Sequence, residues 1–454
     1  MSTLKNRDAS FRELVAEELK RCSKCGSCAS ICPIYAEKKT EAYCSRGKLK
    51  LAQASLAHPG KLSDKTAAIF NDCLFCLACR ENCPGGVRMD KVLLAARELL
   101  VEQGKQSKVK HAIFSHLLAK PARLNGVMRA CGTLQPLLFQ SIPKNSGLRR
   151  RFPLPLLAED QPVPRIAVRP LLDRCQESIQ AKRVRGTVLY FAGCGANYLY
   201  PTIGESVIYI LHELGYDVII PKGQCCCGTP VEVSGDTGTL PDLIRTNIDV
   251  LGAYGYPIIT SCGSCGLMLR KNYPELAPLG QKSKAAAIAG RTFDIAEFLE
   301  QDLGGSDISA HLSRACPGVV TYHDPCHLVR GLGIKAQPRN LIKRTGCIFK
   351  ELREADRCCG SGGTYGVTHW EISRGILDRK IRNIVSSEAS VVATGCPACI
   401  LQIESGLARN KLGCTVLHTV ELLAWHMGYT PAYAHEKIRF DHLKTKTNIP
   451  PLIY

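Results

Sequence analysis

The sequence predicts a mixed α+β and α/β chain with a helical N-terminal domain, followed by two tandem, pseudo-symmetric α/β domains. Three observations predict this architecture. A run of four cysteines near the N-terminus is repeated 51 residues later, and a set of five cysteines further along is repeated 132 to 134 residues later. Around the second repeat, β-prone apolar segments alternate with helical ones, which is typical of open, mainly parallel sheets.

The N-terminal repeat contains two identical cysteine spacings, "CSKCGSCASICP" and "CLFCLACRENCP". Two-cluster ferredoxins use this C-x2-C-x2-C-x3-C-P spacing to hold two cubane [4Fe–4S] clusters, and the fourth cysteine of each run ligates the other cluster. We therefore expect one cluster on Cys22, Cys25, Cys28 and Cys83, and the other on Cys73, Cys76, Cys79 and Cys32. A structural zinc site is the weaker alternative, because zinc needs only two cysteine pairs.

The second repeat contains five cysteines in each copy and centres on the tripeptide Cys-Cys-Gly, so we call it the CCG repeat. Its spacing is C-x31-CCG-x33-C-x2-C in the first copy and C-x31-CCG-x35-C-x2-C in the second. The ten cysteines are Cys194, Cys226, Cys227, Cys262 and Cys265, then Cys326, Cys358, Cys359, Cys396 and Cys399. Five thiolates exceed the four ligands of a tetrahedral zinc or a cubane, so each copy predicts a site with more metal-facing positions.

The predicted strands place these thiols at one edge of each sheet. "GTVLYFAGC" and "YGYPIITSCGSC" are strands that lead into the first copy's thiols, and "GVVTYHDPC" and "EASVVATGCPAC" do the same in the second copy. In open α/β sheets, ligands bind in the crevice beyond the carboxyl ends of the strands. We therefore expect the thiols to converge there. Nearby glycines would let the backbone approach a bulky cluster closely, namely Gly228, Gly360, Gly362 and Gly363.

Tandem CCG repeats behind a two-cluster ferredoxin motif resemble a known family, the CCG-domain iron–sulfur oxidoreductases. It includes the catalytic subunit of membrane-linked heterodisulfide reductases and the iron–sulfur subunits of glycolate and lactate oxidases. The likeness extends over roughly residues 20 to 425 and includes "SRGKLKLA", "YHDPCHLVRGLGI", "ADRCCGSGGTYGV" and "VVATGCPACILQI". It implies a five-cysteine noncubane [4Fe–4S] cluster, and two complete copies imply one or two of them beside the two cubanes. Two departures are Cys225, which makes the first motif a triplet and adds a candidate ligand, and Cys44, where the family commonly has serine.

The resemblance implies an iron–sulfur electron-transfer subunit of a multi-subunit oxidoreductase, inactive without its partners. We expect it to serve a flavin-dependent lactate or glycolate dehydrogenase. The alternative is a heterodisulfide-reductase-like subunit with its own disulfide or thiol activity, coupled to a membrane cytochrome or quinone complex. A third hypothesis is a non-redox zinc scaffold. The chain has no Gly-x-Gly-x-x-Gly fingerprint, so any flavin or nicotinamide would belong to a partner.

The formal net charge is +19, and aromatic residues make up 6% of the chain. Nucleic-acid binding is not expected, because no stacking aromatics are interleaved with the basic residues. Each cluster with its thiolates carries a charge of about −2, which offsets part of the excess positive charge. The remaining positive charge would suit an anionic lipid surface or an acidic redox partner, and "GLRRRF" at 147–152 is the best local basic patch. Without a signal-peptide core or a spanning segment, we expect a cytoplasmic protein, peripheral on the inner face of the membrane.

Two histidines and six further cysteines complete the candidate residues. His323 and His327 flank Cys326 and are candidate catalytic proton carriers, although such residues often only bond a strand end. In a reducing compartment disulfides are not expected. The cysteines outside the motifs are therefore predicted to be buried small hydrophobic residues: Cys44, Cys131, Cys175, Cys316, Cys347 and Cys414.

These patterns divide the chain into five segments. The predicted segments are a two-cluster ferredoxin-like domain (1–104), a helical and Pro/Arg-rich connector (105–185), the first CCG domain (186–310), the second CCG domain (311–430) and a C-terminal tail (431–454). The tail loses its hydrophobic period, so we expect it either to dock on a partner or to remain solvated.

Overall fold

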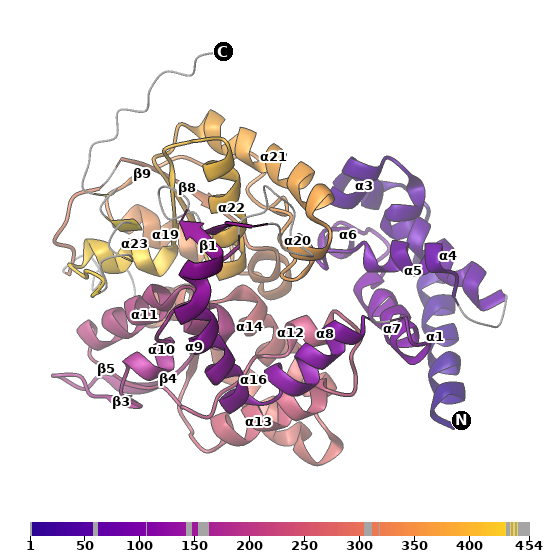
Figure 1. Cartoon of the computed structure of the whole chain (residues 1–454), viewed down its shortest axis with the longest axis horizontal. Helices are drawn as coiled ribbons and strands as arrows, with labels where there is room; N and C mark the ends of the chain where they lie inside the picture. The colour runs from indigo at the N-terminus through magenta and orange to yellow at the C-terminus, as the bar shows by residue number, and fades with distance from the viewer. Residues whose placement is uncertain are drawn as a thin grey trace.

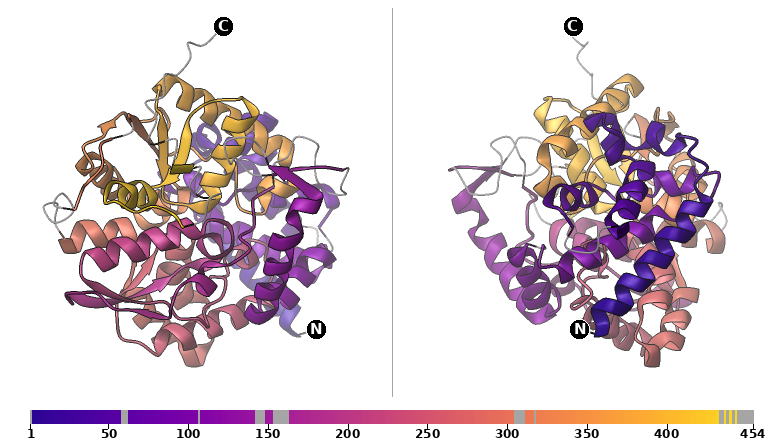
Figure 2. Two further views of the ribbon diagram at one scale, coloured as in Figure 1. Left: turned by 60° about the vertical axis from the view of Figure 1, so that its left-hand side comes forward. Right: turned by 90° about the vertical axis from the view of Figure 1, so that its right-hand side faces the viewer.

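A computed structural model shows how these segments are arranged (Figure 1). It describes residues 2–57, 62–105, 107–141, 148–152, 163–303, 311–316, 318–432, 436, 439–440 and 443. The N-terminal domain lies at one end of the molecule, and the two α/β domains lie side by side in the remainder (Figures 1 and 2).

The N-terminal domain is helical because its apolar residues recur at helical spacing before, between and after the two cysteine motifs. Its core contains Phe11 and Val15 of the first helix and Val92 and Leu93 of the last. Ser63 caps one helix by accepting a hydrogen bond from the amide of Thr66. The elements are α1 (Ser2–Arg21), α2 (Ser27–Ile31), α3 (Pro33–Lys38), η1 (Glu41–Tyr43), α4 (Ser45–Ala57), α5 (Asp64–Asn71), α6 (Ala78–Glu81) and α7 (Met89–Glu102).

The connector forms a helical arm that runs along the outside of the first α/β domain (Figure 2). Only one side of its long helix faces the protein, where the Gln135 side chain bonds the backbone of Pro164 and Ile166. The elements are α8 (Lys108–Ile113), η2 (Phe114–Leu118), α9 (Pro121–Leu138), β1 (Phe139–Ser141), β2 (Leu148–Arg150) and α10 (Leu171–Arg174). The proline-rich stretch 153–162 lies outside the described residues.

The first CCG domain contains a five-stranded sheet in the order β3-β5-β4-β6-β7, in which only β3 is antiparallel. The strands are β3 (Ser178–Ile179), β4 (Gly186–Phe191), β5 (Tyr216–Ile219), β6 (Ile258–Thr260) and β7 (Thr292–Asp294). The helices are η4 (Gly195–Leu199), α11 (Pro201–Glu213), α12 (Thr229–Glu232), α13 (Leu240–Gly252), α14 (Gly263–Leu267), η5 (Met268–Asn272), α15 (Tyr273–Leu276), η6 (Leu279–Gln281), α16 (Lys282–Gly290) and α17 (Ile295–Leu303).

The second CCG domain repeats this topology with a four-stranded parallel sheet in the order β9-β8-β10-β11. Its strands are β8 (Val319–His323), β9 (Ile348–Phe349), β10 (Val391–Thr394) and β11 (Thr415–His418). Its helices are η7 (His327–Gly331), α19 (Ala336–Arg344), α20 (Tyr365–Thr368), α21 (Trp370–Ser387), α22 (Pro397–Arg409) and α23 (Thr419–His426). The predicted alternation of strands and helices, and its duplication, are confirmed.

The two CCG domains share one hydrophobic core. It includes Val188 and Ile203 from the first domain and Val392 and Val420 from the second, all fully buried. The two domains are therefore packed as one body. Of the predicted tail, Arg439 and Phe440 are described and buried: Arg439 forms an ion pair with Glu421 of α23, and Phe440 joins the core of the second domain. At these positions the chain packs on its own domain, and most of the tail lies outside the described residues.

Candidate metal centres

Each CCG domain carries its cysteines on the loops that follow its first three parallel strands, β4, β5 and β6 in the first domain and β8, β9 and β10 in the second. Cys194 follows β4 and Cys262 follows β6, and these neighbouring strands send their connections to opposite sides of the sheet. Cys326 and Cys396 follow the equivalent strands, β8 and β10. This junction is the topological switch point at which open α/β sheets bind ligands. The fold therefore brings the thiols together as the strand pattern predicted.

The five thiols of the second copy form one continuous series of sulfur contacts. Cys358 lies between Cys326 and Cys359, and contact with these two thiols raises its pKa well above the usual value. Cys359 in turn contacts Cys358 and Cys399, and these hydrogen bonds hold its pKa well below the usual value. Cys399 then contacts Cys396. Cys326 is half-buried, and the other four are buried.

The first copy repeats this series with its own five thiols. The contacts run from Cys194 to Cys226, Cys227, Cys265 and finally Cys262. Cys194 is exposed, whereas its counterpart in the second copy is half-buried. Both sets therefore gather five sulfur atoms at largely buried positions, which fits a metal–sulfur centre because thiolates are its natural ligands.

Two further sulfur contacts connect the sites to one another. Cys262 of the first copy contacts Cys396 of the second. Cys76 of the N-terminal domain contacts Cys358, and this hydrogen bond, which outweighs the effect of burial, lowers the pKa of Cys76 to about 6. The three domains thus place their cysteine sites edge to edge, in the order N-terminal domain, second CCG copy, first CCG copy.

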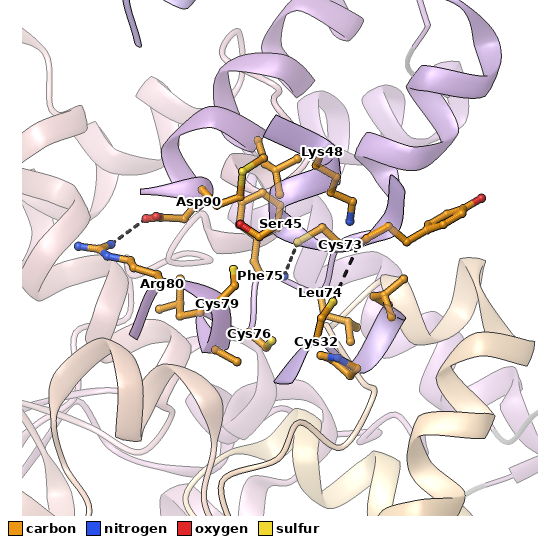
Figure 3. A pocket seen from close by; sticks show the side chains of 17 residues that line it. Cys32, Ser45, Lys48, Cys73, Leu74, Phe75, Cys76, Cys79, Arg80 and Asp90 are labelled. Atoms are coloured by element: carbon orange, nitrogen blue, oxygen red, sulfur yellow. Dashed lines mark hydrogen bonds and ion pairs between the residues drawn. The ribbon is translucent and has the colours of Figure 1, made fainter. Parts of the chain in front are cut away.

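In the N-terminal domain, Cys32 lies apart from the rest of its own motif. It lines one cavity together with Cys73, Cys76 and Cys79, as Figure 3 shows. Burial and the neighbouring Cys76 and Cys73 raise its pKa to about 11. This grouping is the one that the crossed ferredoxin pattern requires.

The other ferredoxin group is more open. Cys25 is exposed, and its sulfur lies 3.3 Å from the hydroxyl of Ser27. An ion pair of 2.8 Å between Arg88 and the buried Glu18 fastens the loop after Cys83 to the end of α1, immediately before Cys22. The ion pair thereby keeps Cys22 and Cys83, the first and last residues of this predicted ligand set, in the same region of the domain.

Comparisons with known proteins agree with the order of the domains. The chain matches the cysteine-rich CCG domain family at residues 188–270 and 320–404, and the 4Fe-4S dicluster domain family at residues 18–87. It is 32% identical over 240 residues to lactate utilization protein A 2 of Bacillus cereus (strain AH820), which covers 52% of this chain and 97% of that protein. The chain belongs to the CCG-domain iron–sulfur oxidoreductase family.

Two relatives extend over most of this CCG-domain protein. A probable glycolate oxidase iron-sulfur subunit of Bacillus subtilis (strain 168) is 29% identical over 92% of this chain and 96% of that protein. A fumarate reductase (CoM/CoB) subunit of Methanothermobacter marburgensis is 26% identical over 90% of this chain and 72% of that protein. The chain is thus an electron-transferring oxidoreductase subunit that binds iron–sulfur clusters and works within a redox complex.

The two cysteines that depart from the family pattern differ in their surroundings. The Cys225 thiol donates to the carbonyls of Cys226 and Leu243, each at 3.6 Å, so it is engaged by the backbone at the start of the CCG loop. The Cys44 thiol contacts Cys28, and this hydrogen bond lowers the pKa of Cys44 to about 6. Cys44 was expected to be a buried hydrophobic residue; it is buried, but it lies against a predicted ligand.

The candidate histidines have different environments. The Nδ1 atom of His323 lies 3.1 Å from the carbonyl of Ala355, which can only accept, so Nδ1 carries the proton. A ring nitrogen of His323 and the sulfurs of Cys359 and Cys399 lie within 4.8 Å of one another, and contact with His323 adds to the lowering of the pKa of Cys359.

His327 links three domains. Its Nδ1 lies 2.9 Å from the hydroxyl of Ser264 in the first CCG domain, and its Nε2 lies 2.9 Å from the carbonyl of Phe75 in the N-terminal domain. Burial lowers its pKa. Because both ring nitrogens are engaged, the geometry gives His327 a positioning role. The proton-carrier role of either histidine stays a prediction.

The expectation that Cys316 and Cys347 are reduced, buried residues is wrong. They form a disulfide, with their Cα atoms 5.0 Å apart. The reason is topological: Val319 pairs with Ile348 in parallel strands, so the residues that precede these two strands lie side by side. The Nε2 atom of His426 lies 3.4 Å from the Cys347 sulfur.

Three more cysteines outside the motifs were expected to be buried small hydrophobic residues. For Cys131 this expectation is also wrong, because Cys131 is exposed on the outer face of α9, which no described element covers. Cys175 and Cys414 are half-buried. Burial raises the pKa of Cys175 to about 11 and that of Cys414 to about 12, so neither is an activated thiol.

The three domains also enclose a polar cavity of about 450 Å³ next to the first CCG site. Arg80 of the N-terminal domain, Thr229 of the first CCG domain and Arg330 of the second CCG domain all line it. The Thr229 hydroxyl lies 3.4 Å from the sulfur of Cys227. Sequence patterns did not indicate this cavity, because its walls come from three domains that are far apart along the chain.

Proposed function

We propose that this subunit carries electrons along a chain of four iron–sulfur clusters, two cubanes and two noncubane CCG clusters. The observation that carries the proposal is the pair of inter-domain sulfur contacts, Cys76 with Cys358 and Cys262 with Cys396. When bound, such clusters take up and release single electrons at potentials set by their ligands and surroundings. The order of the sites gives an exposed end at Cys25, a largely buried second CCG site in the middle, and a second exposed position at Cys194.

The protein supplies the ligands and the surroundings that such clusters require. The ferredoxin ligands would be Cys22, Cys25, Cys28 and Cys83 for one cubane, and Cys73, Cys76, Cys79 and Cys32 for the other. The CCG ligands would be the two five-cysteine sets. Burial excludes water from most of these sulfurs, and His323 adds one ring nitrogen beside two sulfurs of the second CCG site. Groups that surround the ligands in this way orient them and tune the metal.

We infer that the partner is a flavin-dependent dehydrogenase of a 2-hydroxy acid such as lactate or glycolate. The similarity to a glycolate oxidase iron-sulfur subunit over almost the whole chain supports this choice. Electrons from the flavoprotein would enter at the exposed ferredoxin end, because electron transfer needs close approach. Affinity purification of the subunit from its own organism should recover a flavoprotein, and recovery of a haem-containing membrane subunit alone would contradict this proposal.

Cluster content is tested by iron and sulfide analysis of the anaerobically purified protein. We expect about sixteen irons per chain for four clusters, whereas about eight would mean that only the cubanes are present. Cys358→Ser should remove about four irons. Cys225→Ser is the matched control, because that thiol is held by backbone carbonyls and its loss should leave the iron content unchanged. Zinc in place of iron at the CCG sites would refute the proposal.

The cavity beside the first CCG site favours a second candidate function, the reduction of a disulfide substrate by this subunit itself. The similarity to a fumarate reductase (CoM/CoB) subunit is consistent with such chemistry. The two functions are distinguished by giving the purified subunit a chemical reductant and a small organic disulfide. Turnover without any partner subunit would support the second candidate, and no turnover would support the relay.

A further inference from the structure

The connector has an unusual charge distribution. Residues 103–158 contain ten basic residues and not one aspartate or glutamate. About one eighth of the chain therefore carries +10 of the formal net charge of +19. The basic residues are Lys105, Lys108, Lys110, Lys120, Arg123, Arg129, Lys144, Arg149, Arg150 and Arg151.

Few of these charges are neutralised by the rest of the fold. Arg129 forms an ion pair of 2.7 Å with Asp173, and Lys105 pairs with Asp64. Within the described part of the chain, no ion pair joins a carboxylate to Lys108, Lys120, Arg123 or Arg149, all of which are exposed. The connector thus presents a positive surface to solvent.

The same surface is also apolar. Seven of the thirteen large, exposed hydrophobic residues in the described chain lie between residues 109 and 152. On α9 they form a stripe at helical spacing: Val127 is 39% exposed, Leu134 54% and Leu138 46%, with exposed Cys131 between them. Beside the stripe, Leu137 is 68% exposed, and Val109 and Ile113 extend the apolar surface onto α8.

The opposite face of α9 is fixed to the protein, so the stripe cannot simply turn inward. Leu124 and Gln135 are buried there, and a side chain on Gly132 would meet the backbone of Ala167 at about 3 Å. Beyond α9, the β1–β2 hairpin adds Arg149, Arg151 and the 61% exposed Phe152. Figure 2 shows α8, α9 and this hairpin along one edge of the molecule.

We propose that this connector surface, formed by α8, α9 and the β1–β2 hairpin, binds the headgroups of an anionic phospholipid membrane. Aliphatic side chains interspersed with lysine and arginine are typical of helices that lie in a membrane interface. Protein interfaces, in contrast, are depleted in lysine and enriched in aromatic residues, and Phe152 is the one exposed aromatic residue in this described surface. No helix in the described ranges is long and apolar enough to cross a bilayer, so this contact would be peripheral.

The test is sedimentation of the intact holoprotein with lipid vesicles. We expect binding to vesicles that contain phosphatidylglycerol and little binding to vesicles of phosphatidylcholine alone. Binding should fall steeply between low and high salt, because screening weakens the attraction between exposed charges. Replacing Arg123, Arg149 and Arg151 by glutamine should weaken binding about a hundredfold, since each basic residue contributes roughly 1 kcal/mol near an anionic surface.

Matched controls separate this surface from general charge and hydrophobicity. Leu134→Gln with Leu137→Gln should abolish binding. Leu279→Gln with Val367→Gln should not, although these two positions elsewhere on the protein are also more than half exposed. Lys282→Gln with Lys284→Gln removes exposed charge from α16 and should have little effect. The proposal is overturned if the control variants lose as much vesicle binding as the variants of the connector surface. It is also overturned if the intact protein does not bind vesicles and the connector-surface variants lose a partner subunit instead. The readout is independent of the clusters, whose iron content should remain unchanged in every variant.

Discussion

Replacing Arg339 by leucine should destabilise the second CCG domain by about 3–5 kcal/mol. Arg339 lies on α19 and forms a bidentate ion pair of 2.7 and 2.8 Å with Asp324, which is 1% exposed. It also bonds both oxygens of Glu351. Breaking a buried pair from one side leaves the other charge uncompensated, which typically costs this much. Because Asp324 lies two residues before Cys326, the variant should also lose iron from the second CCG site.

Urea unfolding measures this loss, because both tryptophans of the chain, Trp370 and Trp425, report on the second CCG domain. With a slope of about 2 kcal/mol/M, the midpoint should fall by about 2 M. Arg344→Leu is the control on the same helix. Its pair with Glu300 is more exposed, so its loss should cost no more than about 1 kcal/mol. Equal shifts for the two variants would refute the reasoning.

Three further predictions concern other parts of the fold. Burial raises the pKa of Glu232 from 4.5 to about 7, so the contribution of this carboxyl to stability is complete below pH 4.5 and is lost as the pH rises through 7. Glu232→Gln should flatten this pH dependence of stability, which urea unfolding followed by circular dichroism at about pH 5.5 and 8 would measure. The Cys316–Cys347 disulfide closes a 31-residue separation, so Cys316→Ser should lower stability by about 3–4 kcal/mol, and a reductant should destabilise only the unsubstituted protein. Gly263→Ala places a Cβ 2.9 Å from the Leu328 backbone and should weaken the interface between CCG domains, which limited proteolysis would reveal.

The parts of the site that the sequence predicted are those encoded locally. Cysteine spacing identified both ferredoxin motifs, because ligands carried on one loop need fixed separations. The five-thiol sets are spread over three loops each, and their repetition in the chain identified them. Strand patterns placed Cys194 and Cys326 correctly at strand ends, because a buried parallel strand is a short apolar run bounded by turn residues. Duplication strengthened both predictions, since two copies had to satisfy the same pattern.

The parts that could not be predicted depend on how domains pack. The contacts of Cys76 with Cys358 and of Cys262 with Cys396 join different domains, and no spacing in the sequence encodes them. The Cys316 disulfide was missed for a related reason, since it depends on the pairing of β8 with β9. The linking role of His327 was missed because its partners come from two other domains.

The duplication also shows where the two CCG sites differ. Phe191 and His323 occupy equivalent positions, 132 residues apart, each at the end of the first parallel strand of its domain. Phe191 packs among Cys226, Cys227 and Cys265 as an apolar neighbour, whereas a ring nitrogen of His323 lies beside the thiols of Cys359 and Cys399 in the second copy. The same five-thiol arrangement therefore has an apolar wall in one domain and a polar ring nitrogen in the other.

This difference bears on electron flow because hydrogen bonding and burial set the potential of an iron–sulfur centre. Two identical sites in contact would give electrons no preferred direction between them. The two CCG sites differ in both hydrogen bonding and burial. The second site has a polar nitrogen beside two of its sulfurs, whereas the first is enclosed by Phe191 but open to solvent at Cys194. The fold thus uses one duplicated scaffold to hold two unequal sites at a direct sulfur contact. In the relay that we propose, this inequality would favour one direction of electron flow.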